Sequence, residues 1–179
     1  MNILILGGGG LIGQKLTRKL ADLGQLRGRA IDTVTLADVV MPAPVEAGFP
    51  VKTVACDMRR SEDVAGVLSA DIDVIFLLAA VVSAQAEADF DAGYQTNLHG
   101  TLAVLERARA LGTRPVVVFS SSIVAFGGDV PDAVDDETHL NPQTSYGTQK
   151  AIGEMLINDY SRKGSIDCLL YTSPSPRDA

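Results

Sequence analysis

The chain has 179 residues, of which 46% are hydrophobic and 21% are charged, and it carries a formal net charge of −7. These values are typical of one globular domain and exclude a disordered chain. The negative charge opposes binding to polyanions, and without tryptophan there is no evident platform for stacking bases. We therefore predict no nucleic-acid partner.

The N-terminal apolar run ends at glycines after Leu6 and has no basic region before it, so it is too short for a signal peptide or a membrane span. Cys56 and Cys168 are too few for a disulfide framework or a metal cluster. His99 and His139 lack the partner spacing of metal ligands. We predict a cytoplasmic protein with no membrane contact and no metal site.

Short apolar runs alternate with longer amphipathic ones, which is typical of βαβ units. The predicted strands are Asn2–Leu6, Thr33–Ala37, Val51–Ala55, Asp73–Leu78 and Pro115–Ser120. The predicted helices are Leu11–Leu23, Ser61–Ser69, Ala88–Leu111 and Thr144–Lys163. This order predicts an α/β fold, a Rossmann-type doubly wound parallel sheet with helices on both faces.

The first predicted strand runs directly into the glycine-rich segment Gly7–Gly13, and a predicted helix follows. Glycines at such a turn let backbone N–H groups approach a pyrophosphate, and the helix N-terminus supplies free donors. Two registers fit: Gly8, Gly10 and Gly13 match G-x-G-x-x-G, while Gly7, Gly10 and Gly13 match G-x-x-G-x-x-G. Both predict a dinucleotide site, and a merely flexible loop is the alternative.

Asp38 follows the second predicted strand, where an acidic residue can accept hydrogen bonds from the adenosine ribose. Its carboxylate would repel a 2′-phosphate, and the next three residues offer no cation to offset that charge. We predict NAD rather than NADP as the cofactor. The alternative is a solvated loop carboxylate.

Tyr146 and Lys150 lie four residues apart on one predicted helix, and hence on one face. The pKa of a phenol is too high for a base near neutrality, but a nearby ammonium or an oxidised nicotinamide stabilises the phenolate. Tyr146 is then a candidate acid/base for a substrate hydroxyl or carbonyl. Ser122 closes the fifth predicted strand, where its hydroxyl could hold the substrate oxygen, although it could also satisfy a turn.

Together these features resemble the extended short-chain dehydrogenase/reductase family, also called the NAD-dependent epimerase/dehydratase family. The likeness runs from Met1 to about Asp167, and its landmarks are Gly7–Gly13, Asp38, Asp57-Met58, Leu78-Ala79-Ala80, Asn97, Gly100-Thr101, Ser122, Tyr146 and Lys150. Among the landmarks that the resemblance assigns to NAD are Gly7, Gly10, Leu11, Ile12, Gly13, Asp38, Tyr146 and Lys150.

The resemblance also implies roles that the residues alone do not suggest. Asp57 and Met58 would lie at the adenine, and Leu78, Ala79 and Ala80 would pass the centre of the cofactor. Asn97 would kink its helix and hold a water in a proton relay with Lys150. Two predicted helices with apolar stripes would pair across a homodimer; the stripes are Leu98, Leu102 and Leu105, and Ile152, Met155 and Leu156.

Within the family, the segments Leu78–Ser83, Glu87–Asp91 and Thr144–Glu154 resemble the D-erythronate dehydrogenase group, which oxidises a four-carbon sugar acid with NAD. Leu6, Leu77 and Phe126 depart from the common family residues. Phe126 lacks the hydroxyl of the tyrosine that is frequent there, which weighs against a nucleotide-sugar substrate.

The resemblance implies an enzyme, an oxidoreductase that transfers a hydride from a sugar-acid hydroxyl to NAD with Tyr146 as acid/base. A nucleotide-sugar 4-epimerase or dehydratase is one alternative, and a non-catalytic dinucleotide sensor is another. Tyr146 and Lys150 argue against the sensor, because binding alone does not need them.

The C-terminal end departs from the family pattern. Ile166–Tyr171 predicts the opening of a sixth strand, but we expect Thr172 onward not to continue it, because prolines remove ladder donors. We interpret residues 1–168 as an NAD-binding Rossmann domain without its C-terminal substrate region, and we expect no turnover from it alone. Residues 169–179 resemble a translated sequencing adapter, so we interpret them as a non-native tail; a natural flexible tail is the alternative.

Overall fold

The computed structural model describes residues 1–128, 130, 133–135 and 137–173 of the chain. Its main sheet has six parallel strands in the order β5-β4-β1-β6-β7-β8. The strands are β1 Asn2–Leu6, β4 Thr33–Asp38, β5 Val51–Ala55, β6 Val74–Leu77, β7 Val116–Ser122 and β8 Asp167–Ser173. The strand order reverses between β1 and β6, and ligands of such sheets bind beyond the carboxyl ends of the strands at this switch point.

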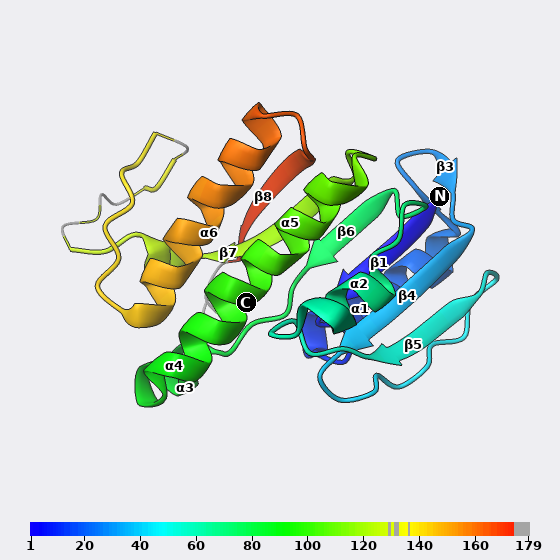
Figure 1. Cartoon of the computed structure of the whole chain (residues 1–179), viewed down its shortest axis with the longest axis horizontal. Coiled ribbons are helices and arrows are strands. Elements are labelled where there is room, and N and C mark those ends of the chain that lie inside the picture. Colours follow the sequence, from blue (N-terminus) through cyan, green and yellow to red (C-terminus); the bar gives the residue numbers. More distant parts are fainter. Residues whose placement is uncertain (129, 131–132, 136, 174–179) are drawn as a thin grey trace.

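The helices are α1 Leu11–Leu23, α2 Ser61–Val67, α3 Ser83–Ala88, α4 Phe90–Gly93, α5 Thr101–Leu111 and α6 Ser145–Arg162. A π-helical segment, η1 Tyr94–Gly100, joins α4 to α5, and a short 3-10 turn, η2 Ile123–Ala125, follows β7. Figure 1 shows α2, α5 and α6 in front of the sheet and α1 behind it. The predicted fold class, with helices on both faces of a parallel sheet, is confirmed.

The alternation of side chains along β1 builds one core on each face of the sheet. Ile3 and Ile5 are fully buried in a core that also contains Leu20 of α1. Leu4 and Leu6 join the opposite core, against Val64 of α2, Leu105 of α5 and Ile157 of α6. A strand covered on both faces has no polar side to alternate with, which explains its continuous apolar sequence.

The predicted helix Ala88–Leu111 is helical apart from Asp89, but it is not one continuous α-helix. Helical structure begins earlier, at Ser83, and is interrupted at Asp89, whose backbone leaves the helical region. The Asp89 carboxylate instead accepts a hydrogen bond of 3.0 Å from the N–H of Ala92 and starts α4. The prediction also missed a two-stranded antiparallel hairpin, formed by β2 Gln25–Leu26 and β3 Arg29–Ala30.

The sixth strand extends further than predicted. Thr172 and Ser173 pair with Ser121 and Ser122 of β7, so β8 continues to Ser173. Threonine and serine keep their backbone donors, and the first proline comes only at residue 174. The predicted boundary at residue 168 falls inside β8, and residues 174–179 of the predicted tail lie outside the described residues.

None of the helices in the described part of the chain has the length and apolarity that a membrane crossing requires.

Candidate active site

Close packing at the loop after β1 excludes side chains at several glycines. Gly7 has φ +90°, and a Cβ there would lie 2.6 Å from the backbone nitrogen of Ala79. A Cβ at Gly13 would lie 2.3 Å from the carbonyl oxygen of Gly7, and one at Gly8 would lie 2.8 Å from the Cβ of Leu36 on β4. Both registers left open by the sequence therefore begin at a glycine that the fold requires. At Gly10 a Cβ would meet only the Gly7 oxygen, at 3.4 Å, so the fold has room for it.

The N-terminus of α1 is open to an anion. Gly10 gives the helix no side-chain cap, and the first turn contains no acidic residue. The first N–H groups of the helix therefore lack acceptors within it, and no side-chain charge offsets the positive end of its dipole. Leu11 and Ile12 are 73% and 54% exposed. Their apolar side chains offer no hydrogen-bond donor, so a phosphate could use only their backbone N–H groups.

A cleft of about 410 Å³ opens beside this loop at the carboxyl ends of the central strands. Its lining includes the predicted cofactor residues Gly7, Gly10, Asp38, Asp57, Met58, Leu78, Ala79 and Ala80. It also includes residues that the sequence did not indicate: Val39, Cys56, Arg59, Val81, Gln85, Ala92 and Thr96. The structure thus brings most of the predicted cofactor residues together. Leu11, Ile12 and Gly13 lie beside the cleft rather than in its lining, and Tyr146 and Lys150, on α6, are also outside it.

Asp38, the last residue of β4, directs its carboxylate toward the glycine loop. Its Oδ2 accepts a hydrogen bond of 3.0 Å from the N–H of Gly9, and its Oδ1 accepts one of 2.8 Å from the N–H of Val39. These bonds fix the carboxylate at the wall of the cleft. A negative charge therefore stands where the sequence predicts the ribose contact.

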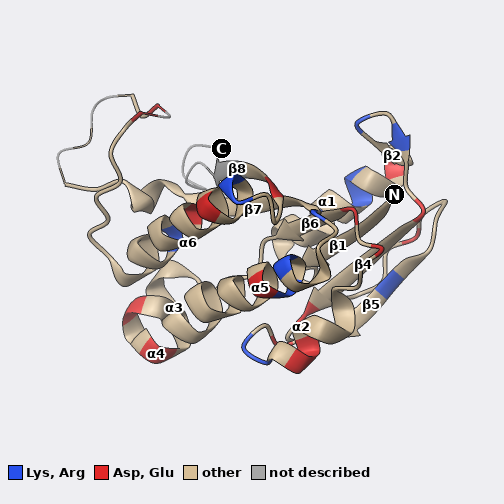
Figure 2. Cartoon of the chain, turned by 45° about the horizontal axis from the view of Figure 1, so that its top comes forward, with Lys and Arg blue, Asp and Glu red and all other residues tan. Residues whose placement is uncertain are grey.

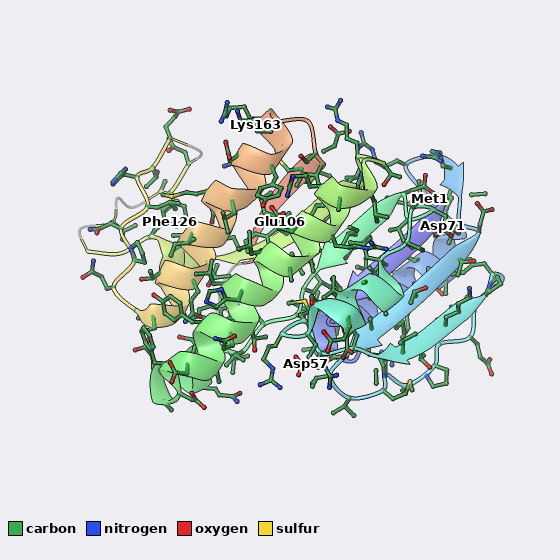
Figure 3. All side chains as sticks on the ribbon, viewed as in Figure 1. Met1, Asp57, Asp71, Glu106, Phe126 and Lys163 are labelled. Carbon is green, nitrogen blue, oxygen red and sulfur yellow. The ribbon has the colours of Figure 1, made fainter. Side chains whose placement is uncertain are left out.

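Arg59 places a cation in the same cleft, which the sequence analysis did not anticipate. Its guanidinium contacts Asp57, with 2.6 Å between Nη2 and Oδ2 and 2.9 Å between Nε and Oδ1. These hydrogen bonds lower the pKa of the Asp57 carboxyl. Figure 3 labels Asp57 next to the start of α2, and the ribbon in Figure 2 shows basic and acidic residues adjoining there. The charge of Arg59 is thus balanced by Asp57.

Tyr146 and Lys150 lie on one face of α6, next to the end of β7. The side chain of Lys150 is buried, and its Nζ donates a hydrogen bond of 2.8 Å to the carbonyl oxygen of Ser120. The same Nζ lies 4.8 Å from the ring centroid of Phe119 and 5.6 Å from that of Tyr146. The ammonium is thus buried near two aromatic rings, which attract a cation, and is hydrogen-bonded to a carbonyl. A lysine on the protein surface would remain in water instead.

Burial controls the acidity of both groups. It lowers the pKa of Lys150 to about 8, while the nearby carboxylate of Glu154 acts in the opposite direction. Burial also raises the pKa of Tyr146. The sequence argument expected the ammonium to lower the pKa of Tyr146, whereas in this structure loss of solvation raises it, because a buried phenolate is costly.

The three serines that end β7 have different partners. The Ser120 hydroxyl donates to the carbonyl oxygen of Leu77 at 3.3 Å, and the buried Ser121 hydroxyl donates to Glu154. The Ser122 hydroxyl accepts a hydrogen bond of 3.4 Å from the N–H of Val124 and caps η2. The turn role that the sequence left open is thus present at Ser122. Its place at the carboxyl end of β7 agrees with the predicted position.

Asn97 lies in the π-helical segment η1, so the helix is irregular where the kink was predicted. Its Oδ1 accepts a hydrogen bond of 2.7 Å from the N–H of Val81, and its Nδ2 donates to the Val81 carbonyl at 3.0 Å. Nδ2 also donates to Oε1 of Gln149 at 2.7 Å. Among the described residues, these contacts join Asn97 to the cleft wall and to the neighbour of Lys150 on α6.

The sequence model of the NAD dependent epimerase/dehydratase family matches residues 3–173. The chain belongs to this family. The match confirms the resemblance inferred from the sequence, and with it the assignment to an NAD-dependent enzyme family.

Within the NAD dependent epimerase/dehydratase family, the chain is 47% identical over 171 residues to a D-erythronate dehydrogenase from Cupriavidus necator, covering 93% of the chain and 52% of the relative. It is 39% identical to a D-erythronate dehydrogenase from Haemophilus influenzae, covering 98% of the chain and 55% of that protein. The crystal structure of a nucleoside-diphosphate-sugar epimerase from Agrobacterium tumefaciens superposes with a TM-score of 0.92 at 44% identity, covering 97% of the chain and 52% of that structure. The chain spans about half the length of these proteins.

Gln149 is a buried polar residue of the candidate site, and the sequence analysis did not single it out. Its side chain is 0% exposed, and within the described part of the chain its Nε2 has no hydrogen-bond partner. The sequence gives no signal for this role, because it depends on the hydrogen bond between Gln149 and Asn97, which lies 52 positions earlier.

Proposed function

We propose that the chain carries the cofactor-binding and proton-transfer residues of an NAD-dependent dehydrogenase that oxidises a hydroxyl of a D-erythronate-like sugar acid. The observation that carries the proposal is the buried ammonium of Lys150 beside the Tyr146 ring, in a chain 47% identical to a D-erythronate dehydrogenase. A protein that only senses the dinucleotide does not need a buried ammonium beside a tyrosine, and burying this charge costs free energy.

The cleft fits NAD. The open N-terminus of α1 suits the pyrophosphate, and the small Gly10 leaves room for it to approach. Asp38 would accept hydrogen bonds from the ribose, Asp57 and Met58 would lie at the adenine, and Leu78–Ala80 would line the centre. Bound NAD supplies the hydride acceptor and, when oxidised, a positive charge that favours a phenolate.

The chain's own residues handle the proton. The phenolic oxygen of Tyr146 would receive the proton of the substrate hydroxyl as its carbon loses the hydride. The Lys150 ammonium would stabilise the phenolate that accepts it, and Ser122 would orient the substrate oxygen. Asn97 would hold a water in the proton relay that includes Lys150.

A nucleotide-sugar epimerase is the second candidate, supported by the likeness to the Agrobacterium tumefaciens structure of that name. Both candidates begin by oxidising the substrate, but an epimerase returns the hydride. Accumulation of NADH therefore distinguishes them.

The test follows NADH formation with four-carbon sugar acids and UDP-sugars, using the chain and the whole gene product that carries it. Net NADH from a sugar acid, lost in Tyr146→Phe while NAD still binds, would support the dehydrogenase. Interconversion of UDP-sugars without net NADH would support the epimerase. Unchanged activity in Tyr146→Phe would exclude the proposed proton acceptor.

We further propose a cytoplasmic homodimer in which α5 and α6 pair with a second copy. On α6 the Met155 side chain is 61% exposed, whereas Leu105 of the predicted stripe on α5 is fully buried against the sheet and belongs to the core. Met155→Glu should shift the sedimentation coefficient to that of a monomer. An unchanged coefficient would argue against this interface.

A further inference from the structure

Two consecutive serines of β7 hold two charged side chains of α6. The carbonyl oxygen of Ser120 accepts the hydrogen bond of Lys150, and the hydroxyl of Ser121 donates to the carboxylate of Glu154. Lys150 and Glu154 are four residues apart and therefore adjacent on the helix surface. Ser121 is only 4% exposed, so its hydroxyl fixes the carboxylate from the protein interior.

Within the described part of the chain, the other groups that contact Lys150 are uncharged. On its own helix it faces Tyr146 and Glu154, and from β7 it meets the Phe119 ring and the Ser120 carbonyl. Next to it on α6, Gln149 is paired with the neutral amide of Asn97 on η1.

Other carboxylates that contact α6 lie toward its ends. Glu87 of α3 accepts a hydrogen bond of 2.5 Å from the N–H of Ser145, and Glu106 of α5 accepts one from Tyr160. Figure 3 labels Glu106 on α5, on the side toward α6. The charge that raises the pKa of Lys150 is that of Glu154.

We propose that Glu154, anchored by Ser121, is a positioning residue that keeps Lys150 in its charged form beside Tyr146. The inference rests on the proposed roles of Tyr146 and Lys150, and it adds a residue that acts through the lysine without touching substrate or cofactor. Burial lowers the pKa of Lys150 to about 8, close enough to neutrality for the loss of one nearby negative charge to discharge it.

The direct test measures the pKa of Lys150 in the 179-residue chain. The measurement is a pH titration by NMR, with carbon-13 labels in the lysine side chains. Lys150→Met identifies the signal by its disappearance, and the exposed lysines serve as internal references: Lys15, Lys19, Lys52 and Lys163. Glu154→Gln, which keeps the shape of the side chain, should lower the pKa of Lys150 by about one unit. Ser121→Ala should cause a smaller decrease, because the carboxylate remains but loses its anchor.

Asp159→Asn is the matched control. Asp159 lies on the same helix and its carboxylate pairs with exposed Arg162, so the variant removes one charge at a distance from Lys150. An unchanged pKa of Lys150 in Glu154→Gln would overturn the proposal, and so would an equal shift in Asp159→Asn. Neither outcome depends on turnover, so this test is separate from the test of the proposed function.

The activity assay gives a second readout that a merely structural role would not produce. Well above the pKa of Lys150 in both proteins, Glu154→Gln should turn over about tenfold more slowly than the parent protein, because a pKa difference of about one unit there changes the charged fraction about tenfold. Below both pKa values, Lys150 is charged in both proteins and their rates should agree within about twofold. A ratio of rates that does not change with pH would overturn the proposal.

Discussion

The side-chain amides of Asn97 and Gln149, 52 residues apart in sequence, share a buried hydrogen bond of 2.7 Å. Asn97 also holds both backbone groups of Val81, which lines the cofactor cleft. Gln149 directly precedes Lys150 on α6. Tyr146, Lys150 and Ser122 lie outside the lining of that cleft, so this hydrogen-bonded chain is a physical connection between the two groups of predicted site residues.

The connection predicts unequal effects for its two members. Asn97→Ala removes the partner of both Val81 groups and should cost about 3 kcal/mol of unfolding free energy and weaken NAD binding. Gln149→Met removes one acceptor and also the Nε2 donor, which has no partner among the described residues, so it should cost about 1 kcal/mol or less. Urea unfolding and NAD titration of both variants and the double variant measure this, with an expected coupling of about 1 kcal/mol. Equal costs for the two single variants would contradict the geometry.

Two glycines of the loop separate folding from binding. A methyl group at Gly13 would lie 2.3 Å from the Gly7 carbonyl oxygen, so Gly13→Ala should destabilise the protein by about 3 kcal/mol or more. Gly10 has φ −72° and space for a methyl group, so Gly10→Ala should unfold at nearly the same urea concentration as the parent protein. It should nevertheless bind NAD about tenfold more weakly, because the methyl occupies the approach of the pyrophosphate. Normal NAD binding by Gly10→Ala would place the pyrophosphate elsewhere.

The hydrophobic pattern was sufficient to predict the bounds of those elements that are marked by one continuous run of residues. The bounds of β1, β5 and α1 agree with the predicted ranges, and Gly7, Gly10 and Asp38 of the predicted nucleotide site line the cleft. The other predicted lining residues, Asp57, Met58 and Leu78–Ala80, came from the family resemblance. What the sequence did not indicate depends on contacts between distant segments. The contact of Arg59 with Asp57 is local, but its place in the cleft depends on how the β5–α2 loop lies against the central strands. The role of Gln149 exists only once α6 packs on η1. The break at Asp89 was missed because a capping aspartate in an amphipathic run resembles any polar helix residue.

The pair of Asp57 and Arg59 predicts a change in cofactor preference. Asp57 balances the guanidinium charge, so Asp38 faces a 2′-phosphate with little help from Arg59. Asp57→Asn removes the balancing charge and should narrow the preference for NAD over NADP by about tenfold, which is about 1.4 kcal/mol. Dissociation constants for both cofactors measure the change. Adding Arg59→Met should restore the preference, and if it does not, the released cation is not the cause.

The buried ammonium of Lys150 predicts a pH dependence of stability. The pKa falls from an ordinary value of 10.5 to about 8 in the folded protein, so the unfolded chain binds the proton more tightly. Below about pH 8 the folded protein bears the full cost of the buried charge. As pH rises toward 10.5 the folded state loses the proton first, and the unfolding free energy increases by up to roughly 3 kcal/mol from this group.

Comparison with Lys150→Met isolates this contribution, because other groups titrate alike in both proteins. Cys56 is one such group: burial raises the pKa of its thiol to about 11, which acts against stability as pH rises. At about pH 7 Lys150→Met should be the more stable protein, and by about pH 9.5 its advantage should shrink by about 2 kcal/mol. Urea unfolding across this range measures the difference. An advantage that stays constant with pH would mean that Lys150 does not titrate there, and that burial does not hold its pKa near 8.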